Sequence, residues 1–197
     1  MPRQAAQTRD QILIKALNAI WDKGFHALSI DQLTRATCAS RQAIYSQFGN
    51  KHALYLECFE AYRETVVRPA IDRLFAAQDG LSAITAYFEA QISLAESYGL
   101  PGPGCFVGNA MTETAPHDPQ VRIRVESHNT LLKDAFAAAL ASPGLNLTRE
   151  DQHDLANILL VAAQGIWAMS RITNSASELR EHAVRFVNIV RERVQHV

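Results

Sequence analysis

The stretch Ser29–Lys51 constrains the chain more than any other, because its pattern predicts two short helices joined by a tight turn. Ser29 and Gln32 form an S-x-x-Q capping box, which is typical of a helix start. The helix that follows has to end by Cys38-Ala39, and Ser40 caps the next one. Two short helices in this arrangement predict a helix-turn-helix.

The second of these helices separates its apolar residues from its polar ones. Ile44 and Phe48 are four positions apart and are expected to face the core of the domain. The N-terminal end keeps small and polar side chains on its outer side, which suits the major groove of DNA. The predicted outward residues are Arg41, Gln42, Ala43, Ser46 and Gln47.

The charge distribution supports this interpretation, although the net charge of −1 by itself says nothing about DNA. Residues 1–51 hold seven Lys and Arg against three acids, a net of +4, and the rest hold twelve against seventeen, a net of −5. A basic end on an acidic body is typical of a module that docks on phosphates by one face. Two amphipathic helices that pack without touching DNA are the weaker interpretation.

Further residues at fixed offsets extend the pattern over about the first quarter of the chain. They are Thr8-Arg9, Ile12-Leu13, Ala16, Gly24-Phe25, Ser29-Ile30, Ile44-Tyr45, Phe48-Gly49-Asn50-Lys51 and Leu54-Tyr55. In these residues the chain resembles the N-terminal domain of the TetR family of one-component repressors. The resemblance implies an all-α homodimer with a variable C-terminal ligand-binding domain.

The sequence departs from the family pattern at two places. Cys38 stands where the family usually has Gly, at a position that tends to need φ > 0, so mild backbone strain is expected there. Gln42 and Ala43 stand where Gly or Thr is frequent. Base preference therefore does not carry over from relatives.

Two residues that flank the second helix have roles implied by the resemblance. The family residues that match Tyr45 and Lys51 contact backbone phosphates, which positions a protein without reading sequence. The alternatives to phosphate contact are structural: Tyr45 would be a half-buried aromatic that holds the helix, and Lys51 would be a solvated lysine. The residues expected to bind DNA are Ser29, Ser40, Arg41, Gln42, Ala43, Tyr45, Ser46 and Lys51.

The whole chain is expected to be all-α, with about nine helices. Residues 1–51 are predicted to form a DNA-binding domain, and residues 52–197 a ligand-binding and dimerisation domain. Pro69 predicts a kink or a new turn near Val66–Pro69, because proline lacks the N–H for an interior helical bond. Thr148-Arg149-Glu150-Asp151 predicts another capping box.

The last two predicted helices, residues 151–171 and 177–194, carry broad apolar stripes. The resemblance implies that two such helices from each subunit form a four-helix interface, and a two-fold DNA site needs two DNA-binding domains. The alternative is that both helices only cover their own core. The stripe predicted for the interface is Leu179, Ala183, Phe186, Val187 and Val190.

Polar and aromatic residues set among apolar ones in the C-terminal half predict a ligand pocket. Each of them is by itself as well explained as a satisfied core group or a surface residue. The predicted ligand-binding residues are Gln91, Tyr98, Cys105, Asn109, His128, Gln164 and Trp167.

Cys105 has a second predicted role. It follows a Pro/Gly loop and starts a helix, where unpaired N–H groups favour a thiolate. Gly104-Cys105-Phe106-Val107, followed by Asn109, Glu113 and the turn 115–119, also resembles a TetR branch. Some members of that branch sense electrophiles or oxidants through the matching cysteine, and others bind small acids or metals. The alternative is a buried cysteine that acts as a small hydrophobe.

No catalytic or phosphate-binding motif is present, so an enzyme is not expected, and neither a cofactor nor a metal site is predicted. No apolar run approaches a membrane span, and three unpaired cysteines indicate a reducing cytoplasm. The prediction is a repressor that binds a palindromic double-stranded DNA operator as a homodimer and is released by a small-molecule inducer. A redox sensor acting through Cys105 and a ligand-free DNA-binding protein are the alternatives.

Overall fold

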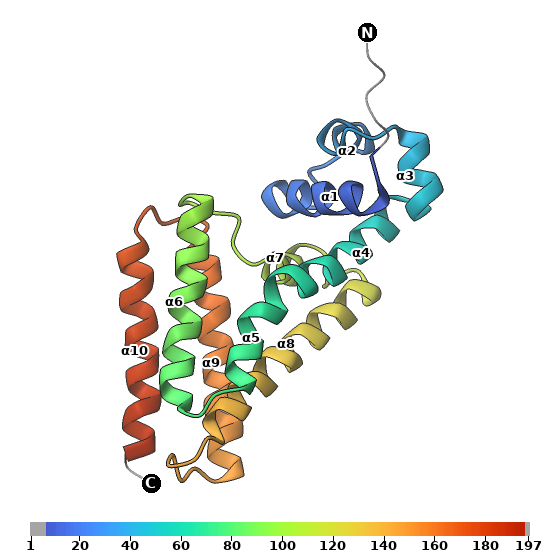
Figure 1. Cartoon of the computed structure of the whole chain (residues 1–197). Coiled ribbons are helices and arrows are strands. Elements are labelled where there is room, and N and C mark those ends of the chain that lie inside the picture. The colour runs from blue at the N-terminus through green and yellow to red at the C-terminus, as the bar shows by residue number, and fades with distance from the viewer. Residues whose placement is uncertain (1–6, 196–197) are drawn as a thin grey trace.

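The computed structural model describes residues 7–195, and all regular secondary structure in this part of the chain is helical (Figure 1). The helices are α1 (Arg9–Lys23), α2 (Ile30–Thr37), α3 (Arg41–Phe48), α4 (Lys51–Tyr62), the π-helical turn η1 (Arg63–Val67), α5 (Arg68–Phe75), α6 (Gly80–Tyr98), α7 (Phe106–Glu113), α8 (Pro119–Leu140), α9 (Arg149–Met169) and α10 (Ala176–Gln195). Because α4, η1 and α5 follow one another without a break, residues 7–195 hold nine separate helical segments, as expected.

The molecule has two parts, which we name the head (α1–α3) and the body (α5–α10). The rod α4–η1–α5 leads from the head into the body, where α8 packs on α5 and α9, and α10 packs on α6 and α9. The short helix α7 lies where the two parts meet (Figure 1). Within residues 7–195, no helix combines the length and the apolar character needed to cross a bilayer.

Local capping signals begin the helices where the sequence predicts. The Ser29 Oγ accepts a hydrogen bond from the Gln32 N–H (3.2 Å), and the Gln32 Oε1 accepts one from the Ser29 N–H (2.7 Å). At the start of α8, the Asp118 carboxylate accepts from the N–H groups of Gln120 (2.9 Å) and Val121 (3.2 Å). These bonds satisfy donors that the first turn of a helix leaves unpaired.

The capping box predicted at Thr148 and Asp151 is only half formed. The Thr148 Oγ1 accepts from the Asp151 N–H (3.1 Å), as a cap should. The Asp151 carboxylate accepts instead from the Thr148 hydroxyl (2.6 Å) and from Arg193 of α10 (2.9 Å). Aspartate is one methylene shorter than the glutamate of a full capping box, which explains why it does not reach the backbone behind it.

The predicted interruption before Pro69 is confirmed. Residues Arg63–Val67 form a π-helical turn, and α5 starts at Arg68 with the proline in its first turn. Proline cannot donate the backbone hydrogen bond that a continuous α-helix would need there. The π-helical turn shifts the register of the backbone hydrogen bonds, so α4, η1 and α5 continue as one rod although this bond is missing.

Cys38 ends α2 in the left-handed region, with φ 55° and ψ 33°. This was predicted because the family usually has glycine at this position. A β-carbon is unfavourable in this conformation, so Cys38→Gly is expected to raise the free energy of unfolding by about 0.5–1 kcal/mol. Urea unfolding measures this, with Cys38→Ala as the control that removes the thiol but keeps the β-carbon. An equal gain from alanine would show that the thiol, and not φ, is unfavourable.

The α10 stripe assigned to a dimer interface lies within the chain's own core, so this part of the prediction is wrong. Leu179, Ala183, Val187 and Val190 are at most 5% exposed, and Phe186 is half-buried at the edge of the stripe. The stripe covers α6 and α9, because folding buries the most apolar face of a helix against its nearest neighbours.

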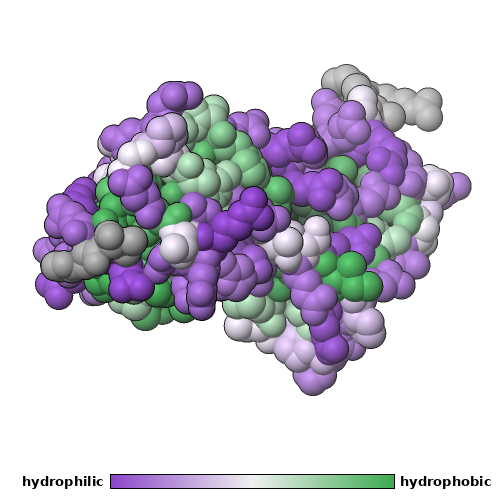
Figure 2. Space-filling model, turned by 90° about the horizontal axis from the view of Figure 1, so that it is seen from below, coloured by the Kyte–Doolittle hydropathy of each residue, from purple (hydrophilic) through white to green (hydrophobic). Residues whose placement is uncertain are grey.

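A different apolar surface remains exposed on α9. Its members are separated by three and four residues in alternation, so they follow one side of the helix and continue past its end. Ile158, Val161 and Ile172 are 42%, 70% and 74% exposed, and Gly165 and Ala168 between them are also exposed. We name these five residues the α9 row. In Figure 2, hydrophobic residues reach the surface of both head and body between hydrophilic ones.

Candidate nucleic-acid interface and cleft

The N-terminal end of α3 forms an open polar surface on the head. The Ser40 Oγ caps the helix by accepting from the Ala43 N–H (3.0 Å), which holds the end of α3 in place. Ala43 is half-buried, while the other predicted contacts on this helix face solvent, with Tyr45 41% exposed. The exposed members are Ser40, Arg41, Gln42, Tyr45 and Ser46, and Ser29 is exposed at the start of α2.

Arg41 is held at the edge of this surface by a neighbour on α2. Its Nη2 donates to the Asp31 Oδ1 at 2.7 Å, and both side chains are more than half exposed. Hydrogen bonding to Asp31 raises the pKa of the Arg41 guanidinium. An ion pair this exposed contributes little to stability, so Arg41 is free to exchange Asp31 for another anion.

Lys51 does not face solvent as a surface lysine would. Its Nζ donates to the backbone oxygen of Phe25 (2.6 Å) and lies 4.1 Å from the centroid of the Phe25 ring. Partial burial lowers the pKa of the Lys51 ammonium. Lys51 therefore ties the start of α4 to the α1–α2 loop, and the solvated-lysine alternative is wrong.

Glu113, which the sequence resemblance includes without giving it a role, links the body to the same loop. Its carboxylate at the end of α7 accepts from the backbone N–H groups of Phe25 (3.2 Å) and His26 (2.8 Å). Gly24 permits this approach, because a β-carbon there would lie 3.1 Å from both carboxylate oxygens. The α1–α2 loop is thus held by Glu113 of α7 and by Lys51 of α4.

Other bonds between distant residues close the junction of head and body. The Trp21 Nε1 donates to the Gly104 oxygen (2.9 Å), and the His52 Nε2 lies 2.6 Å from the Asp118 carboxylate. In these contacts, Glu113, Gly104 and Asp118 lie 66 to 88 residues away along the chain from the residues that they meet. No local sequence pattern could therefore have found these pairs. They make the junction a defined contact between α1, α4, α7 and the start of α8.

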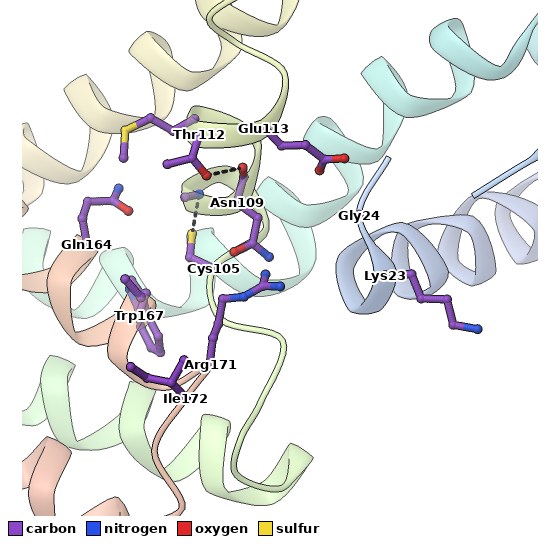
Figure 3. Close-up of a pocket in the computed structure, with 13 residues that line it drawn as sticks. Lys23, Gly24, Cys105, Asn109, Thr112, Glu113, Gln164, Trp167, Arg171 and Ile172 are labelled. Atoms are coloured by element: carbon purple, nitrogen blue, oxygen red, sulfur yellow. Dashed lines mark hydrogen bonds between the residues drawn. The ribbon is translucent and has the colours of Figure 1, made fainter. Parts of the chain in front are cut away.

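A cleft of about 490 Å³ lies beside this junction (Figure 3). Its walls are the end of α1, one face of α7 and the C-terminal part of α9. Four of the predicted ligand-binding residues line it: Cys105, Asn109, Gln164 and Trp167. Residues that the sequence did not predict also line it, among them Lys23, Thr112, Glu113 and Arg171.

The other three predicted ligand residues do not reach the cleft, so the prediction of one shared pocket is wrong. Gln91 and His128 line a cavity of only about 20 Å³ with Cys105 and Trp167. Tyr98 is 56% exposed and borders another cavity of about 20 Å³ with Gln91 and Trp167. Trp167 is the common wall of all three spaces, and tight packing of the aromatic core separates them.

His128 has no charge at neutral pH. It is buried on α8, and burial lowers its pKa to about 4. Buried groups avoid the charged form because the interior solvates charge poorly. Among the described residues no group of three or more His, Cys, Asp or Glu is placed to hold a metal ion.

Cys105 begins α7 as predicted, but its thiol is not activated. The Sγ accepts from the Gly108 N–H (3.3 Å) and from the Tyr62 hydroxyl (3.6 Å). The side chain is buried, and this burial raises the pKa of Cys105. The expectation of a favoured thiolate is wrong, because desolvation outweighs the helix N-terminus and the two hydrogen bonds.

Comparison with known proteins identifies the family. Residues 12–58 match the model for bacterial regulatory proteins of the tetR family. Residues 80–187, more than half of the chain, match the tetracyclin repressor-like C-terminal domain. The first match covers the helix-turn-helix and the start of the rod, and the second covers most of the body.

Individual relatives agree with these matches. The uncharacterized HTH-type transcriptional regulator YezE of Bacillus subtilis (strain 168) is 25% identical over 179 residues, which cover 87% of this chain and 90% of the relative. The HTH-type transcriptional repressor ComR of Escherichia coli (strain K12) is 28% identical over 62% of this chain and 59% of its own length.

Solved structures show the same fold. A cysteine mutant of the TetR family transcriptional regulator CifR, complexed with 26-bp operator DNA, has a TM-score of 0.81 at 21% identity and covers 95% of this chain and 98% of its own. A TetR family regulator from Cytophaga hutchinsonii has a TM-score of 0.79 at 17% identity, with 93% of each chain covered. With both family models matched and the helix-turn-helix in place, this protein belongs to the TetR family of bacterial transcription regulators.

Proposed function

We propose that this protein is a repressor that binds a near-palindromic operator as a homodimer and leaves it when a small molecule binds to the body. In this proposal residues 1–51 bind DNA, and residues 52–197 bind the ligand and the second subunit. The observation that carries it is the capped, exposed N-terminal end of α3, within residues 1–51, whose net charge is +4. The names of two relatives point the same way, since ComR is a repressor and CifR binds operator DNA.

The proposed DNA contacts divide into two groups. Arg41, Gln42 and Ser46 are exposed on α3 and are placed to meet base edges in the major groove. Ser29, Ser40 and Tyr45 are also exposed and are proposed to meet phosphates. Lys51 joins them only if it releases the Phe25 oxygen, so we propose that it acts through the position of α4.

Arg41→Ala is expected to weaken operator binding by roughly tenfold to a hundredfold, because a bidentate arginine–guanine contact would be lost. Electrophoretic mobility shift with genomic fragments, followed by footprinting, measures this change. Binding of the unchanged protein should fall steeply as salt rises, since counterions leave the phosphates. Arg191→Gln, on the flank of α10 away from Ile189, is the control for loss of one positive charge. Salt-independent binding, or no binding to any genomic fragment, would refute the proposal.

We propose that two copies meet through the part of the α9 row that lies away from the cleft, which is Ile158, Val161 and Gly165, and through the neighbouring flank of α10. Ile158 and Val161 are 42% and 70% exposed and Ile189 on α10 is 50% exposed, whereas Ala168 and Ile172 of the row border the cleft. Such a continuous apolar surface is unfavourable in water and is typical of a subunit interface. An isologous pairing of this kind also supplies the two heads that a palindromic operator requires.

The cleft supports a ligand-responsive regulator over a ligand-free DNA-binding protein. Its volume of about 490 Å³ falls in the range of small-molecule sites, about 300–1,000 Å³. A regulator without a ligand would be expected to fill this space with side chains. The position of the cleft beside the head is the basis of the inference that follows.

A further inference from the structure

We propose that the cleft takes a small organic carboxylate that also carries a hydroxyl or N–H donor, and that this ligand releases the head by displacing Glu113. This inference rests on the proposed function, because it specifies the ligand and the coupling of the same regulator. Three features of the cleft carry it: a cation without a full set of partners, a buried acceptor without a donor, and a carboxylate bonded to the head.

The cationic feature of the cleft is Arg171. Its Nη1 donates to the Pro103 oxygen at 3.2 Å, and the other guanidinium donors have no partner within the described residues. Figure 3 shows this guanidinium beside the Asn109 side chain, within the cleft. Lys23 borders the cleft but its side chain points away from it (Figure 3), and Glu113 is the one carboxylate among the lining residues. A planar guanidinium with free donors binds a carboxylate in a bidentate manner.

The buried acceptor is the Gln164 side chain. Its Nε2 donates to the Asn129 Oδ1 at 3.0 Å, and its Oε1 is buried with no hydrogen-bond partner in the described structure. A buried acceptor without a donor is unfavourable, and a ligand hydroxyl or N–H would satisfy it. Gly108 of α7 keeps the space open, because a β-carbon there would lie 2.9 Å from this oxygen.

The remaining wall of the cleft suits a flat ligand. Trp167 lies between Gln164 of α9 and Arg171, two residues past the end of α9, and presents an aromatic side chain to the cleft (Figure 3). The volume of about 490 Å³ accommodates a ligand of one or two rings. A ring stacked on Trp167 would direct a carboxylate toward Arg171 and a donor toward Gln164.

Glu113 couples this ligand to DNA. Both of its carboxylate oxygens accept from backbone N–H groups of the α1–α2 loop, so the carboxylate holds the head in one orientation. An anionic ligand in the same cleft repels Glu113, because two like charges close together in a partly dry site are unfavourable. When Glu113 leaves Phe25 and His26, the head loses this link to α7 and no longer keeps the orientation that fits the operator.

The ligand class is tested by calorimetry with salicylate, benzoate and phenol, in the absence of DNA. We expect salicylate to bind best, benzoate more weakly and phenol not at all. Arg171→Gln is expected to weaken salicylate binding by roughly tenfold or more, and Gly108→Ala by a similar factor. Arg185→Gln, which removes a charge outside the cleft, should leave binding unchanged. Equal binding of phenol and salicylate, or no binding by any carboxylate up to about 10 mM, overturns the ligand class.

The coupling is tested with Glu113→Gln, which keeps the size and one acceptor oxygen but removes the charge. This variant should bind salicylate at least as tightly as the unchanged protein and remain on the operator when salicylate is added. Glu126→Gln, an exposed acid of α8 outside the cleft, should still be released. Release of Glu113→Gln to the same extent as the unchanged protein overturns the coupling.

These outcomes are distinguishable from a failure of the proposed function. Calorimetry measures ligand binding without DNA, so it is independent of repression. If the unchanged protein binds no operator but binds salicylate through Arg171, the proposed function fails and the ligand site stands. If it binds the operator and no carboxylate enters the cleft, the regulator stands and the ligand site fails.

Discussion

Val161→Glu is expected to convert the protein to a monomer and to weaken operator binding by about a hundredfold or more, since an unpaired charge would be buried in the interface. Val161 belongs to the α9 row and is 70% exposed in the single chain. The substitution therefore removes no contact of the monomer's own core. An effect on assembly can thus be separated from an effect on folding.

Sedimentation velocity at micromolar concentration and an operator mobility shift measure the two parts of this prediction. Val184→Glu is the matched control, because Val184 is also exposed (54%) but lies on the other flank of α10. Arg180 on that flank pairs with Glu89 of α6, whereas Arg193 on the opposite flank pairs with Asp151 of α9. A wild-type monomer at micromolar concentration, or a Val161→Glu dimer that binds the operator normally, would refute the α9 row as the interface.

Cys105 is expected to react with iodoacetamide at neutral pH at least roughly a hundredfold more slowly than Cys38, because only an accessible thiolate is nucleophilic. Burial raises the pKa of Cys105, so the fraction of thiolate at neutral pH falls, and the closed fold excludes the reagent. Cys58 is buried with a raised pKa as well, and Cys38 is the exposed cysteine.

Mass spectrometry of the native protein at timed intervals reads the three rates separately. The same experiment in denaturant is the control, since unfolding should bring the three rates close together. In Cys38→Ser no fast-reacting thiol should remain. If Cys105 reacts as fast as Cys38 in the native protein, and its modification releases DNA, a redox or electrophile sensor would replace the small-molecule inducer proposed above.

The sequence by itself determined the features that depend on neighbours along the chain. The Ser29 capping box and the new helix before Pro69 follow from the preferences of a few adjacent residues, while the left-handed Cys38 followed from the glycine that the family usually has there. The same kind of signal placed Asp118 at the start of α8. Local hydrogen bonds and backbone dihedrals act over three or four residues, so a short sequence pattern contains them completely.

The two helices of the helix-turn-helix and the turn between them could also be predicted, because capping, apolar periodicity and charge coincide in one short stretch. Gln47, expected to face outward, is instead half-buried. Periodicity was less informative for α10. It correctly placed Leu179 and Val190 on the buried apolar face of the helix. However, a stripe that faces the chain's own core has the same period as a stripe that faces a second subunit. Only the packing of α10 on α6 and α9 separated the two possibilities.

Only the tertiary structure decided the charged and polar contacts of the candidate site. Cys105 lost its expected activation because other helices cover it, and Lys51 turned inward to the Phe25 oxygen. Glu113 reached the head across 88 residues of sequence to Phe25. Desolvation and hydrogen bonding depend on which distant segments the fold brings within a few ångströms, and no local pattern contains that information.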